Sequence, residues 1–97
     1  MAKAKIGLCT LDFHLAGVAS LKEKRRILKP VVTRLQNKFN VAVAEVDHQD
    51  TWQSAQIAIT TVSNSSVHIQ KVLGEVIEYI ETYHPEALII KQELEIL

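Results

Sequence analysis

The sequence predicts an α+β sandwich in which two helices cover one face of a four-stranded antiparallel sheet. Two patterns predict it: four apolar stretches suit strands, and two others repeat with helical spacing. They follow the order strand–helix–strand–strand–helix–strand. With short connections and right-handed crossovers, this order favours the sheet order 4-1-3-2, the ferredoxin-like arrangement. The length of 97 residues and the apolar content of 47% suit a single domain over residues 1–97.

The first strand and the first helix have the clearest local signals. Residues 5–15 alternate in polarity, which predicts a strand with one buried side. Ser20 and Glu23 have the spacing of a capping box, so a helix is expected over 21–39. Pro30 removes one backbone hydrogen bond inside it, but the apolar stripe keeps its phase, which favours one kinked helix over two. The expected stripe consists of Leu21, Leu28, Val31, Val32, Leu35 and Phe39.

The second half of the chain predicts a hairpin, a helix and a closing strand. The expected bounds are strands at 41–48, 53–62 and 86–96 and a helix at 66–83. One face of the sheet is left uncovered by this arrangement, and apolar residues are expected on it among polar ones. Those expected on the open face are Ile6, Leu8, Val41, Val43, Ile57 and Ile59. An open face this apolar favours self-association, so a homodimer is one expectation.

Composition and missing motifs exclude several classes of protein. No apolar run is long enough for a membrane span, and no secretory signal is recognisable, so no membrane partner is expected. The single cysteine cannot form an internal disulfide, which suits a reducing cytoplasm. There is no paired-cysteine metal motif and no glycine-rich phosphate loop. We therefore expect a cytoplasmic protein that is not an enzyme and uses no metal and no small-molecule cofactor.

Charge is strongly segregated although the net charge is zero. Residues 20–40 contain seven basic residues and one acidic residue, whereas residues 72–97 contain six acidic residues and one basic residue. The residues expected to bind nucleic acid are Lys22, Lys24, Arg25, Arg26 and Lys29. They lie near a helix N-terminus, where the helix dipole disfavours cations, so we interpret them as a site for an anionic backbone such as RNA. The alternative is a surface neutralised by Asp12, Glu45 or a second subunit.

The expected turn between the two central strands is rich in polar residues. A metal or acid–base site would use His48 with Asp47 or Asp50, but no second histidine stands at ligand spacing. A hairpin stabilised by its own side-chain hydrogen bonds, with Trp52 packed over it, is the simpler interpretation. A third is contact with a partner, since tryptophan is a common anchor of interfaces. The residues assigned to partner or loop contact are His48, Gln49, Asp50 and Trp52.

Two segments, SLKEKRRILKP and RLQNKFNVAVAEVDHQDTWQSAQI, resemble the YlxP-like family of small bacterial proteins, a domain family of unknown function. The resemblance extends over nearly the whole chain. Where that family commonly has glycine before the histidine, this chain has Asp47. The resemblance implies a ferredoxin-like fold. It also implies a setting near translation, because such genes often neighbour those for initiation and ribosome-binding factors.

Two hypotheses for function follow from these patterns. The favoured one is a non-enzymatic RNA- or ribosome-associated protein that binds through the basic helix. The other is a protein-interaction or assembly module, such as a homodimer, in which the basic helix docks on acidic residues of another copy.

Overall fold

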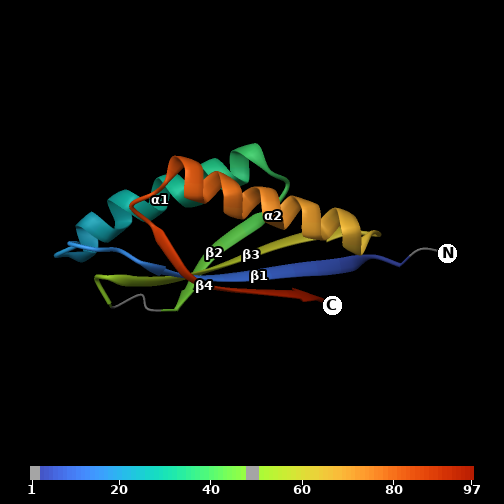
Figure 1. Cartoon of the computed structure of the whole chain (residues 1–97), viewed down its shortest axis with the longest axis horizontal. Helices are drawn as coiled ribbons and strands as arrows, with labels where there is room; N and C mark the ends of the chain where they lie inside the picture. The colour runs from blue at the N-terminus through green and yellow to red at the C-terminus, as the bar shows by residue number, and fades with distance from the viewer. Residues whose placement is uncertain (1–2, 48–50) are drawn as a thin grey trace.

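The computed structural model describes residues 3–47 and 51–97. The chain forms a four-stranded sheet with both helices on one side and the other side open (Figure 1). The elements are β1 (Lys5–His14), α1 (Leu21–Lys38), β2 (Ala42–Asp47), β3 (Ser54–Ser63), α2 (Ser66–Tyr83) and β4 (Leu88–Ile96). These bounds agree with the expected ranges to within two residues.

The strand order is β2-β3-β1-β4, and every neighbouring pair is antiparallel. Read from the other edge, this is the predicted order 4-1-3-2, so the predicted ferredoxin-like topology is confirmed. β1 lies at the centre, with His14 opposite Ser54 of β3 and Leu88 of β4. The end of β1, the start of α1, the β2–β3 connection and the start of β4 therefore meet at one end of the molecule.

The core lies between the helices and the covered face of the sheet. β1 supplies its alternate residues Cys9, Leu11 and Phe13, each at most 1% exposed, as its alternating sequence predicts. The helices contribute one stripe each: Leu28, Val31 and Leu35 from α1, and Ile69, Leu73, Val76 and Ile80 from α2. α2 approaches β1 so closely that a Cβ on Gly7 would collide with Cγ2 of Ile69. Glycine at this position therefore sets the distance between the second helix and the sheet.

The prediction for the open face was wrong for β2 and β3. Ile57 and Ile59 are fully buried under the helices, because they pair directly with Leu11 and Cys9 and so share their face. Val41 and Val43 also pack partly against the core. The open face instead carries smaller side chains, including Ala42, Ala44 and Ala58 beside Leu8, Thr10 and Thr60.

α1 begins at the predicted cap and passes through Pro30 as one helix. Ser20 Oγ accepts a hydrogen bond from the Glu23 amide at 3.1 Å. The Glu23 carboxylate accepts in return from the Ala19 amide at 2.8 Å, one residue earlier than in the standard capping box. The one acidic side chain in the first turn of α1 is thus engaged with the backbone.

Candidate functional site

The β1–α1 loop and the β2–β3 connection are tied together at the end of the molecule where α1 begins. The Leu15 amide donates to the Gln53 carbonyl at 2.9 Å, and the Gln53 side chain donates to the Val18 carbonyl at 3.2 Å. These bonds cross between segments far apart in the sequence. They fix the first turns of α1 relative to the edge of the sheet.

Lys24 is buried and does not lie on the exposed basic surface where the sequence predicted it. Its residue is 2% exposed, and its Nζ lies 3.1 Å from Glu45 Oε2 and donates to the Thr51 carbonyl at 2.7 Å. The sequence held a signal for this position: Lys24 precedes Leu28 by four residues and Val31 by seven, the spacing of the buried stripe. Lys24 is therefore a link between α1, β2 and the β2–β3 connection and is not available to a ligand.

The other four cations form what we call the basic ridge: Lys22, Arg25, Arg26 and Lys29. All four side chains are exposed. Within residues 3–47 and 51–97, the ion pairs join Lys24 to Glu45 and Lys91 to Glu93. No member of the ridge takes part in either. Among the carboxylates that the structure describes, Glu45 neutralises Lys24, as the alternative interpretation of this face expects for one of its cations.

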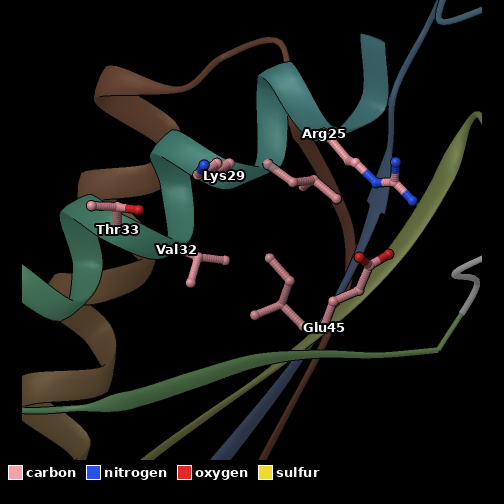
Figure 2. Close-up of a pocket in the computed structure, with 7 residues that line it drawn as sticks. Arg25, Lys29, Val32, Thr33 and Glu45 are labelled. Carbon is pink, nitrogen blue, oxygen red and sulfur yellow. The ribbon is translucent and has the colours of Figure 1, made fainter. Parts of the chain in front are cut away.

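A pocket of about 270 Å³, here called the ridge pocket, opens between the ridge and the sheet (Figure 2). Leu28, Val32 and Ile57 provide apolar lining, and Val32 points into the space below the helix. The polar groups around it belong to Arg25, Lys29, Thr33 and Glu45. Figure 2 shows the side chains of Arg25 and Glu45 pointing toward one another across the pocket. The sequence did not predict this pocket, because it depends on the gap between a helix and a sheet.

The predicted contact residues of the turn are described only in part. His48, Gln49 and Asp50 lie outside the described residues. Trp52 is 51% exposed beside the hydrogen-bonded Gln53, so contact of Trp52 with a partner stays a prediction. In the part of the chain that the structure describes, no three His, Cys, Asp or Glu side chains gather as a metal site would require. Neither described helix is long and apolar enough to cross a membrane.

His84 is a titratable group whose burial the sequence did not predict. It caps the C-terminus of α2, is 2% exposed, and its Nε2 has no hydrogen-bond partner among the described residues. Burial lowers the pKa of His84, and the nearby charge of Arg34 lowers it further, while Glu86 acts in the opposite direction. Folding therefore favours the neutral imidazole.

Acidification is expected to destabilise the fold through His84. Its pKa is lower in the folded state than in the unfolded chain, so its contribution to stability is complete above about pH 6.5 and is lost as the pH falls. The loss is at most about 1.4 kcal/mol per pH unit. Denaturant unfolding between pH 7 and pH 5 measures it, and His84→Phe should flatten the dependence. An equally steep dependence in that variant would assign the effect to other groups.

Solved structures that resemble this fold differ widely in sequence. The de novo designed protein Foldit4 has a TM-score of 0.57 at 8% identity, covering 98% of this chain and 97% of that one. SnoaB, a cofactor-independent oxygenase from Streptomyces nogalater, has a TM-score of 0.51 at 9% identity, covering 96% and 90%. A dimeric ferredoxin-like protein from an uncultured marine organism has a TM-score of 0.47 at 14% identity, and the match covers 96% of this chain and 84% of that one. At such identities the likeness concerns the fold alone.

Sequence relatives place the chain more narrowly. It is 42% identical over 78 residues to the uncharacterized protein YlxP of Bacillus subtilis (strain 168). The matched segment covers 80% of this chain and 85% of that protein. The family model described as a protein of unknown function (DUF503) matches residues 6–94. The chain therefore belongs to the DUF503 family of YlxP-like proteins, whose function is unknown.

Proposed function

We propose that this protein is a non-enzymatic RNA-binding protein, associated with RNA or ribosomes, that holds the anionic backbone on its basic ridge. The observation that carries the proposal is that Lys22, Arg25, Arg26 and Lys29 are exposed without an ion pair to any described carboxylate. The ridge lies next to the β1–α1 loop, which is hydrogen-bonded to Gln53. A polyanion could therefore bind there without breaking contacts within the protein.

The position of the ridge argues for a ligand. Lys22 lies in the first turn of α1, and Arg25 and Arg26 lie in the next. The exposed cation in the first turn costs about 0.3–1 kcal/mol through the helix dipole, which weakens beyond that turn, and the four cations of the ridge also repel one another. A sequence selected for stability alone would place acids in these turns. Phosphates recover this cost on binding, and the translation setting implied by the family resemblance favours RNA as their source.

The open face of the sheet is a poorer site for RNA. RNA-recognition sheets stack bases on aromatic side chains of the central strands. The outward residues of β1 and β3 include Thr10, Asp12 and Ala58, and none is phenylalanine, tyrosine or tryptophan. The exposed acids Glu93 and Glu95 pair with Thr10 and Leu8 and so lie on the same face. RNA is therefore expected on α1.

NMR titration of the protein with a short single-stranded RNA tests the location. Amide shifts are expected to be largest in residues 21–30, because phosphates on the ridge change the local field there. Residues of the open face, such as Thr10 and Ala58, serve as the internal control. Shifts centred on the open face, or none at low salt, would contradict the proposal.

Assembly as a homodimer is the second candidate. It is supported by apolar side chains exposed on the open face, of which Ile6, Val62 and Leu88 are 45%, 62% and 56% exposed. This candidate expects amide shifts on the open face that depend on protein concentration without RNA. The same titration therefore separates the two functions.

A further inference from the structure

The ridge pocket combines an apolar interior with cations on its upper side. Leu28 and Ile57 are 5% and 0% exposed, so they are fixed parts of the core that the pocket reaches. Arg25 and Lys29 lie one helical turn apart on α1 and belong to both the pocket and the basic ridge. A ligand in this pocket thus meets an apolar surface and two exposed cations together.

We propose that the ridge pocket receives one unstacked base of single-stranded RNA, while phosphates of the same strand bind Arg25 and Lys29. This inference rests on the proposed RNA-binding function and specifies its ligand. The faces of a nucleobase are apolar enough to pack on Val32, which is partly exposed, above a buried floor formed by Leu28 and Ile57. The polar edge of the base stays near the mouth, where the Thr33 hydroxyl is exposed. The base is attached to the backbone through its ribose, which brings the phosphates to the ridge.

The dimensions and position of the pocket favour a single strand over a duplex. Pockets for drug-sized molecules have volumes of about 300–1,000 Å³, so a pocket of about 270 Å³ holds one ring system. The bases of duplex RNA are stacked, and their faces cannot reach an apolar pocket. A duplex could contact the ridge through phosphates only. Tighter binding of single-stranded RNA than of duplex RNA therefore measures the contribution of the pocket. The affinity that the two forms share measures the contribution of the ridge.

Other described cavities lack this combination. A larger one, about 410 Å³, is lined by Phe39, Tyr79 and Tyr83, and it has two acids, Glu75 and Glu78, beside one cation. That cation, Lys38, lies 5.8 and 5.5 Å from the ring centroids of Phe39 and Tyr79. The ridge pocket has one acid, Glu45, beside two cations, so it is the less repulsive of the two toward phosphate. A shallow hollow of about 170 Å³ on the open face is lined by residues without charge, among them Leu8 and Ala42. Of these three cavities, the ridge pocket is the one whose lining includes more cations than acids.

The test compares a single-stranded oligouridylate of about twelve nucleotides with a strand of the same length and charge from which every base has been removed. The wild-type protein is expected to bind the base-bearing strand about tenfold more tightly, because one base buries apolar surface in the pocket. Val32→Phe fills the pocket without changing a charge, and it should abolish this preference while leaving affinity for the abasic strand unchanged. Val67→Phe is the matched control, because Val67 is 77% exposed on α2, and it should retain the preference.

Intermolecular NMR contacts supply a second measurement that needs no variant. Base protons are expected to show contacts to the methyl groups of Val32 and Leu28 in the wild-type protein. Equal affinity for the two strands, or base contacts elsewhere, would overturn the pocket assignment and leave the basic ridge as a phosphate site. Failure of the wild-type protein to bind either strand at low salt would refute the proposed function itself.

Discussion

Replacing Lys24 with alanine is expected to lower the free energy of unfolding by about 3 kcal/mol. The substitution removes the ammonium group that lies 3.1 Å from Glu45 and leaves the Thr51 carbonyl without its 2.7 Å donor. Removing one member of a buried ion pair costs about 3–5 kcal/mol when both are fully buried. The Glu45 side chain is 29% exposed, so water can hydrate its carboxylate and relieve part of this penalty. We therefore expect a loss at the lower end of the range of about 3–5 kcal/mol.

Denaturant unfolding of a double-mutant cycle measures this effect. Lys24→Ala, Glu45→Ala and the double variant are compared, and the two changes are expected to be strongly non-additive, because the residues are in direct contact. Lys22→Ala is the matched control, with the same substitution two residues earlier on an exposed position, and it should change stability by less than about 0.5 kcal/mol. Equal losses for Lys24→Ala and Lys22→Ala would mean that the buried pair contributes nothing.

Neutralising the basic ridge is expected to weaken RNA binding by about 10²–10³-fold at 0.1 M salt. The variant replaces Lys22, Arg25, Arg26 and Lys29 with glutamine and thereby removes four cations that would displace counterions from RNA. Stability should stay the same or rise slightly, because cations leave the N-terminal turns of a helix. Loss of binding in a variant that remains folded would therefore reflect the ligand site.

The control for this variant carries the same change in net charge at other places. Lys3, Lys5, Lys71 and Lys91 are replaced with glutamine, and Lys91 also loses its exposed ion pair with Glu93. Binding measured by fluorescence anisotropy should fall by less than about tenfold in this control, through long-range attraction only. Similar losses in both variants would show that total charge, and not the ridge, governs binding.

Local patterns were sufficient to predict the order of elements and the centre of the core. In β1 the apolar and polar residues alternate, and this alternation matches the buried Cys9, Leu11 and Phe13. The start of α1 follows from Ser20 and Glu23, whose interactions are local. Such features depend on residues a few positions apart, so a sequence contains all the information they need.

Features that depend on pairing across the sheet were less predictable. In β3 both alternating sets contain apolar residues, such as Ile57 beside Ala58, so polarity does not distinguish the two faces. The register decides instead: Ile57 faces the helices because it pairs with the buried Leu11. The burial of Lys24 likewise depends on Glu45, which lies on another element. The ridge pocket is a third case, since its volume is the space that α1 leaves above the sheet.

The salt dependence of RNA binding tests the central claim most directly. Four cations that neutralise phosphates of single-stranded RNA predict a slope of log affinity against log salt of about −3 for the wild-type protein. The ridge-neutralised variant should have a slope near zero, and the control variant a slope close to that of the wild type. A wild-type slope as flat as that of the ridge variant, or an unchanged slope after neutralisation, would contradict the account.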